Sequence, residues 1–195
     1  MATPFEEQVH DLKNLNAIIS LARLGTDKVI LNHFRDIIDY RGIVGLINRY
    51  YTPIGMAHRK GSYWLRSLEG RVIGDRLLRL FIGVYSFNEI KDDITAPQLL
   101  KLFTLYHAMW PADEVSTNRI YYYFLALRSQ DVIALPSCSN CQQAFVFHKE
   151  DGGLCCSACE GMKLARIRAA RTQAKEKRAA KVPSNRRRSK AVKVA

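Results

Sequence analysis

Several features that would assign this sequence to a common class are missing from it. No apolar run approaches the roughly 20 residues that a membrane-spanning helix needs. The first residues, 1–7, include two acids and no apolar core, so we expect no secretion and a cytoplasmic location. A Gly-rich phosphate loop, a nucleophile elbow and a His–Glu metal pair are also missing, and the Asp92–Asp93 pair is explained as a loop or helix cap. We therefore do not expect an enzyme.

Acidic residues are scarce near the C-terminal end. Residues 163–195 hold 13 Lys or Arg but one acid, Glu176, and the whole chain carries a net charge of +12. Residues 1–162 are therefore neutral overall, and the positive charge is concentrated in one segment. Such a segment favours a polyanionic partner, because each phosphate contact releases counterions. Few bulky apolar residues follow Ile167, which disfavours a membrane. A tail that is only solvated remains the alternative.

Apolar residues recur at helical spacing through the first 130 residues. Hydrophobic residues make up 48% and charged residues 25% of the chain, which suits a globular core. The pattern predicts a mostly helical domain over 1–130 with about six helices. The predicted helices span 3–25, ending at Gly25, then one capped by Thr26, one after Asp39, a long one from Trp64, one after Pro97 and one after Ser116.

Two short predicted helices within about 27–51 resemble a helix-turn-helix. Their polar face would offer Arg41, Asn48 and Arg49 to DNA. The following loop, 52–62, carries Arg59 and Lys60 as further candidate phosphate contacts. The alternatives are ordinary helix packing with a solvated face for the helix residues, and a merely solvated loop for Arg59 and Lys60.

Two Cys-x-x-Cys pairs lie in the segment 131–161. A spacing of two residues lets both sulfur atoms of a pair reach one ion from a tight turn. The two pairs therefore predict one structural Zn²⁺ per chain, because four thiolates leave no position for water or substrate. The predicted ligands are Cys138, Cys141, Cys156 and Cys159.

The same segment predicts a small zinc-ribbon-like module. Residues 132–135 read as a strand, and residues 144–147, the Gly152–Gly153 turn and a return strand read as a hairpin between the Cys pairs. Cys155 is expected not to be a ligand, and His148 is expected to be a surface residue. The remaining segment, 162–195, is predicted to be a basic tail, helical over 162–182 and disordered from Pro183. Its candidate DNA contacts are Lys163, Arg166, Arg168 and Arg171.

The cysteine segment resembles that of FlhC, a subunit of the bacterial flagellar transcriptional activator. The similarity rests on Leu135–Cys141, Phe145, His148, Leu154 and Cys156–Cys159, and extends to Leu24–Gly25, Ile43–Ile47, Gly55–Met56 and Tyr63–Trp64. The resemblance implies a helical protein with one zinc ion bound by the four cysteines. It also implies a hetero-oligomer with an FlhD-type helical subunit that binds promoter regions of double-stranded DNA and activates flagellar operons with RNA polymerase.

A second reading fits the same features. A zinc-ribbon protein associated with RNA or the ribosome would also combine a Cys₄ module with a basic tail, without needing the helix pair. Binding to duplex DNA in competition with single-stranded RNA distinguishes the two readings.

Overall fold

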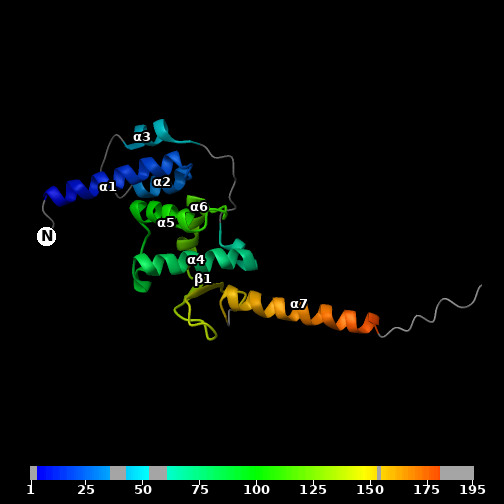
Figure 1. Ribbon diagram of the computed structural model, residues 1–195. Coiled ribbons are helices and arrows are strands. Elements are labelled where there is room, and N and C mark those ends of the chain that lie inside the picture. Colours follow the sequence, from blue (N-terminus) through cyan, green and yellow to red (C-terminus); the bar gives the residue numbers. More distant parts are fainter. Residues whose placement is uncertain (1–3, 36–42, 53–60, 153–154, 181–195) are drawn as a thin grey trace, which may run out of the picture. The chain divides into compact units, whose positions relative to one another are not determined.

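The protein is described by a computed structural model that covers residues 4–35, 43–52, 61–152 and 155–180. Within these ranges the chain is mainly helical and has one two-stranded sheet (Figure 1). It divides into two compact units, 1–157 and 158–195, and the division falls in the first turn of the last helix. The prediction of a mainly helical protein with a cysteine cluster near its C-terminal end is confirmed.

Helix α1 (Pro4–Arg23) ends where the sequence predicts. Gly25 has a φ of 72°, a left-handed conformation that glycine adopts without strain. Its N–H bonds the carbonyl of Ala22, and the N–H of Thr26 bonds the carbonyl of Leu21, both at 3.1 Å. This is a Schellman motif, in which two carbonyls at the end of the helix gain donors.

The sequence predicts that Thr26 caps the second helix, but in the structure Asp27 caps α2 (Lys28–Arg35). The Asp27 carboxylate accepts the N–H of Val29 at 3.0 Å. Thr26 is instead fully buried, and its hydroxyl lies 2.8 Å from that of Thr117. The hydroxyl therefore serves a tertiary contact, which local capping rules do not reveal.

Helix α3 (Ile43–Tyr50) contacts α1, as does α2. The two short helices of the predicted helix-turn-helix are therefore present, but their turn falls in residues 36–42, outside the described ranges. A side-chain hydrogen bond joins the two helices directly, because Lys28 Nζ donates to Asn48 Oδ1 at 3.2 Å.

The centre of the first unit differs from the prediction. The sequence predicts one helix from Trp64, whereas the structure has a short 3₁₀ helix, η1 (Tyr63–Arg66), and then α4 (Leu68–Val84). Ser67 separates them, because its extended backbone breaks the helix and its Oγ accepts the N–H of Gly70 at 3.0 Å to cap α4. A second 3₁₀ helix, η2 (Phe87–Lys91), follows α4.

Helices α5 (Ala96–Met109) and α6 (Thr117–Arg128) complete the helical body. Thr95 and Gln98 form a capping box at the start of α5, and Ser116 Oγ accepts the N–H of Arg119 at 3.2 Å at the start of α6. Helix α5 contacts α1, α4 and α6, which brings their apolar sides into one core. Its largest fully buried members are Tyr106, Tyr123, Phe34, Ile18, Leu21, Ile30, Leu31, Leu65, Leu77 and Leu78.

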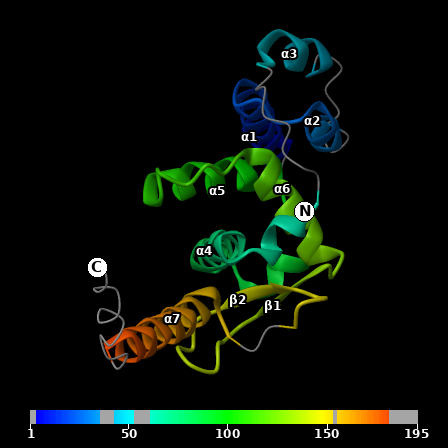
Figure 2. The same cartoon turned by 90° about the vertical axis from the view of Figure 1, so that its right-hand side faces the viewer.

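The hairpin is built differently from the prediction. Strand β1 (Val132–Leu135) pairs antiparallel with β2 (Phe145–His148), and Ile133 faces Phe147 in the register. The first Cys pair therefore lies in the loop inside this hairpin. No return strand follows β2 among residues 149–152 and 155–156. Strand β2 contacts α4 and η1, and β1 contacts α6 (Figure 2). A strand's partner depends on contacts far along the chain, which alternation alone does not specify.

Helix α7 (Ser157–Ala180) begins earlier than the predicted residue 162. Its first turn carries Cys159, and residues 162–173 all have exposed side chains. Residues 181–195, which complete the predicted basic tail, lie outside the described ranges.

Candidate metal centre

The first Cys pair lies in the loop that joins β1 to β2. The N–H of Gln142 bonds the carbonyl of Cys138 at 2.9 Å, and the N–H of Cys138 bonds the carbonyl of Gln143 at 2.8 Å. Gln142 has a φ of 61°, which turns the chain sharply just after Cys141. This tight turn is what a two-residue spacing needs to direct both sulfur atoms to one point.

The second Cys pair lies where α7 begins. Cys156 directly precedes the helix, and Cys159 follows three residues later within the first turn. Residues three apart on a helix share one face, so both sulfur atoms can point the same way.

The four ligand atoms meet in one place. The sulfur atoms of Cys138, Cys141, Cys156 and Cys159 all lie within 4.8 Å of one another, and those of Cys141 and Cys156 are 3.5 Å apart. Tetrahedral Zn–S bonds of about 2.3 Å imply sulfur–sulfur separations of about 3.8 Å. The cluster therefore has the size and the donor chemistry of a site for one metal ion.

Burial of the cluster is uneven. Cys138 and Cys156 are fully buried and Cys159 is 8% exposed, whereas Cys141 is exposed to solvent. Burial disfavours the thiolate of Cys138, but N–H groups of Cys156, Asn140 and Cys141 and the thiol of Cys141 outweigh it and lower its pKa to about 6. The N–H of Cys156 lies 3.3 Å from the sulfur of Cys138. Because metals bind the thiolate, these donors prepare Cys138 as a ligand.

Cys155 and His148, two further candidate ligands near the cluster, differ in their surroundings. Cys155 is half-buried, and it lies outside the group of four cysteines whose sulfur atoms converge in the described part of the chain. His148 is 3% exposed, so the expectation of a surface residue is wrong. Its ring stacks on Tyr63 with centroids 5.8 Å apart, and its Nδ1 accepts the N–H of Glu150 at 3.4 Å. The histidine is therefore occupied in packing the hairpin.

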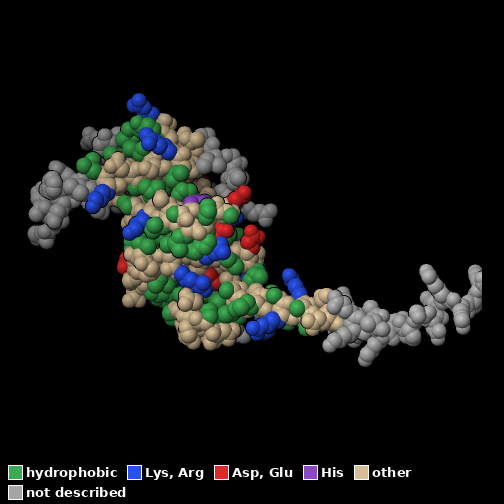
Figure 3. Space-filling view, in the orientation of Figure 1, with side chains coloured by type: hydrophobic (Ala, Val, Ile, Leu, Met, Phe, Trp, Pro, Cys, Tyr) green, Lys and Arg blue, Asp and Glu red, His purple; other side chains and the backbone are tan. Residues whose placement is uncertain are grey.

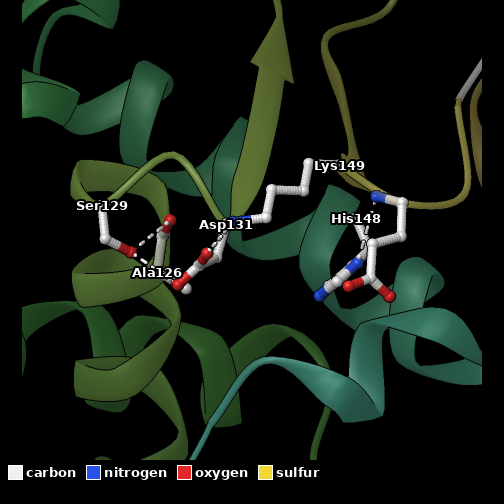
Figure 4. Close-up of polar contacts among 6 residues, drawn as sticks. Ala126, Ser129, Asp131, His148 and Lys149 are labelled. Carbon is white, nitrogen blue, oxygen red and sulfur yellow. Dashed lines mark hydrogen bonds and ion pairs between the residues drawn. The ribbon is translucent and has the colours of Figure 1, made fainter.

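The base of the hairpin is closed by polar contacts (Figure 4). The Asp131 carboxylate accepts a hydrogen bond from Ser129 Oγ at 3.0 Å and forms an ion pair with Lys149. Lys149 and Ser129 hold the pKa of Asp131 below its usual range. The N–H of Lys149 also bonds the carbonyl of Asp131 at 3.1 Å, so the two ends of the hairpin are joined by backbone and side chain.

Helix α4 holds both halves of the cysteine segment, through residues that sequence reasoning missed. Asp75, only 1% exposed, accepts hydrogen bonds from Val146 in β2 and from Ser157 at the start of α7. Arg79 Nε donates to the carbonyl of Ala144 at 2.9 Å. The available signal was an acid three positions from both Val72 and Leu78, and therefore on one face of α4 with apolar side chains. Such an acid, if buried, must find donors elsewhere in the fold.

Gly74 allows this close approach. A Cβ there would lie 2.6 Å from Leu65 Cδ2 and 2.8 Å from Val146 Cγ2, both shorter than normal contacts. The hydroxyl of Tyr123 also donates to the carbonyl of Gly74 at 2.9 Å. Burial and the Asp75 carboxylate raise the pKa of Tyr123 well above its usual value, so the phenol stays protonated as a donor.

The predicted DNA contacts are spread along the chain. Arg41, Arg59 and Lys60 lie outside the described residues. Asn48 accepts its hydrogen bond from Lys28, and Arg49 is exposed, with its guanidinium 5.8 Å from the centroid of the Tyr50 ring. Lys and Arg side chains project from α7 (Figure 3). The four predicted contacts in this helix are all exposed: Lys163, Arg166, Arg168 and Arg171.

Comparisons with known proteins assign no family to the chain. No protein-family model matches the sequence, and no curated protein shows significant similarity to it. Among the described helices, none is both long and apolar enough to cross a lipid bilayer.

Proposed function

We propose that this protein is a zinc-dependent, DNA-binding subunit of a transcriptional activator of the FlhC type, and that it is not an enzyme. The observation that carries the proposal is the convergence of four cysteine sulfur atoms within 4.8 Å, on the residues that the FlhC resemblance names as ligands. Four thiolates suit Zn²⁺ and fill its tetrahedral coordination, so the ion would stabilise the fold and have no open position for catalysis.

The proposed zinc has a clear structural role. The first two ligands lie in the β1–β2 loop and the other two lie at the start of α7, so one ion would join two segments separated by β2. Elemental analysis of protein purified under reducing conditions should give one zinc per chain. A zinc content near zero, with the thiols reduced, would contradict the proposal.

DNA binding would depend on the exposed cations of α7. Each phosphate neutralised by Lys or Arg contributes about 0.9 to the slope of log affinity against log salt on duplex DNA. Replacing Arg166 and Arg171 by Gln should therefore weaken binding and lower that slope by about 2. The matched control replaces Lys91 and Lys101, which are also exposed but lie in the first unit, by Gln, and should leave the slope unchanged.

A competition experiment with RNA distinguishes this proposal from the second candidate function. Competition by single-stranded RNA that exceeds competition by duplex DNA would favour the RNA-associated protein, because the basic helix could bind either polyanion.

Co-expression with an FlhD-type subunit should yield one complex on size-exclusion chromatography. That complex should bind promoter DNA and recruit RNA polymerase.

A further inference from the structure

Asp75 is an acid in an unusual place. Among the described residues it is the only Asp, Glu, Lys or Arg that is buried, with 1% of its surface exposed. A buried carboxylate is costly unless donors surround it, so its partners indicate what it stabilises. Its hydrogen bonds reach two segments. One is β2, which follows the first Cys pair, and the other is the start of α7, which carries the second Cys pair.

Each carboxylate oxygen serves one half of the cysteine site. Oδ1 accepts the N–H of Val146 at 2.8 Å, and Val146 lies in β2, which directly follows the loop of Cys138 and Cys141. Oδ2 accepts the N–H of Ser157 at 2.9 Å and its hydroxyl at 2.6 Å. Ser157 directly follows Cys156 and begins α7.

We propose that Asp75 is a positioning residue for the metal centre: it fixes the separation of the two Cys pairs before metal binds. The inference rests on the proposed zinc binding and goes beyond it, because Asp75 is neither a ligand nor adjacent to one in sequence. Fixing the two halves in advance lowers the conformational entropy lost when metal binds.

The chemistry of the contacts requires a carboxylate and not an amide. Among the described residues, the three groups that contact Asp75 all donate hydrogen: two backbone N–H groups and one hydroxyl. Asparagine has the same shape but only one acceptor oxygen, so its NH₂ group would face the N–H of Val146 or the N–H of Ser157. Asp75→Asn should therefore release one half of the site while leaving the packing volume of α4 unchanged.

The test measures zinc affinity of the folded, full-length protein. Zinc would be titrated against a chromophoric chelator under reducing conditions, with far-UV circular dichroism recorded on the same samples. We expect Asp75→Asn to bind zinc about 10–100-fold more weakly than the wild type, the range typical of residues that orient metal ligands. The matched control is Asp113→Asn, because Asp113 bonds Arg76 and Tyr106 within the helical body. The control should keep wild-type zinc affinity even if it is less stable.

The outcomes separate the two proposals. A wild type that binds no zinc would reject the proposed metal function. A wild type that binds zinc, together with a folded Asp75→Asn variant whose affinity lies within twofold of it, would reject the positioning role alone. An equal loss in Asp113→Asn would also reject that role, because general destabilisation would then explain both variants.

A milder variant tests the proposal if Asp75→Asn does not fold. Ser157→Ala removes only the hydroxyl donor and keeps the backbone N–H on Asp75. We expect a several-fold weaker zinc affinity in a folded protein. Unchanged affinity in this variant would overturn the proposal.

Discussion

At the residue scale, the site combines a buried thiol with donors that favour its anion. Cys138 has no exposed surface, yet its pKa is lowered to about 6 because three backbone N–H groups and the thiol of Cys141 outweigh the effect of burial. A buried cysteine without such donors would be a poor ligand at neutral pH. The turn at Gln142 and the approach of Cys156 thus have an electrostatic role as well as a geometric one.

Replacing Cys138 should weaken metal binding strongly, whereas replacing Cys155 should leave it unchanged. In Cys138→Ser the site loses a thiolate and keeps three, so we expect cobalt affinity to fall by more than about 100-fold, beyond the range typical of residues outside the ligand set. Cys155→Ser should keep the thiolate-to-cobalt charge-transfer bands of the wild type at full intensity. Weakened bands in Cys155→Ser would show that the ligand set has been assigned in the wrong register.

The Asp113 carboxylate should make stability depend on pH. Partial burial opposes its charge, but hydrogen bonds from Tyr106 and Arg76, each 2.6 Å long, hold the pKa of Asp113 below its usual range. A lowered folded-state pKa contributes stability above the unfolded-state pKa, and this contribution is lost as the pH falls through the folded-state value. Wild type should exceed Asp113→Asn in unfolding free energy by about 1–2 kcal/mol at pH 7.

That difference should shrink as the pH falls below about 4, the ordinary pKa of an aspartate. Urea unfolding of both proteins at each pH measures it, and effects of the shared cysteine site cancel in the subtraction. A difference that stays constant down to about pH 3, below that ordinary pKa, would contradict the assignment of the contribution to Asp113.

At the element scale, α4 is the support on which the cysteine segment is assembled. Gly74 lies against the side chain of Val146 in β2, and Asp75 accepts hydrogen bonds from the backbone of β2 and from the start of α7. Arg79 donates to the carbonyl at the end of the β1–β2 loop. Helix caps, apolar spacing and the Cys-x-x-Cys pairs are local signals. The sequence therefore predicted a helix after Pro97, close to the observed start of α5 at Ala96, a helix after Ser116, and the four clustered cysteines.

What the sequence could not predict depends on long-range contacts. The partner of β1, the burial of His148 and the donors of Asp75 all depend on residues far apart in the chain; Ser157, for example, lies 82 positions from Asp75. Periodicity reports which face of an element is apolar, but not which distant segment covers it. The break at Ser67 was missed for a local reason: residues 63–66 continue the apolar pattern of α4 although they form a separate 3₁₀ turn.

Two glycines of α4 should respond oppositely to alanine. Gly74→Ala would drive a Cβ into Leu65 and Val146, and overpacking of this kind costs about 1–3 kcal/mol, more than the roughly 1 kcal/mol gained in helix propensity. Gly83 is exposed, and nothing lies within 4 Å of the position that a Cβ would take there, so Gly83→Ala should stabilise by about 0.5–1 kcal/mol. Thermal unfolding should give a lower Tm for the first and a higher Tm for the second. A Tm for Gly74→Ala at or above the wild-type value would contradict the tight contact.

At the scale of the whole molecule, metal binding and folding should be linked. The proposed ion joins segments that the chain separates by β2, so metal should bind the native state in preference to the unfolded one. Free zinc at about 100 times its dissociation constant should stabilise the protein by about 2.7 kcal/mol. Calorimetry with and without a strong chelator measures the shift, and Cys138→Ser should lose most of it. An equal shift in that variant would place the metal elsewhere.

The buried Asp75 has a consequence for the order in which the protein matures. During translation α4 leaves the ribosome long before Val146 and Ser157, so the carboxylate lacks these two partners until the last third of the chain has been made. A nascent helical body must therefore keep this acid hydrated and its core incomplete. A premature stop codon ahead of Val146 should yield a product that is degraded, even though most of the helical sequence has been made.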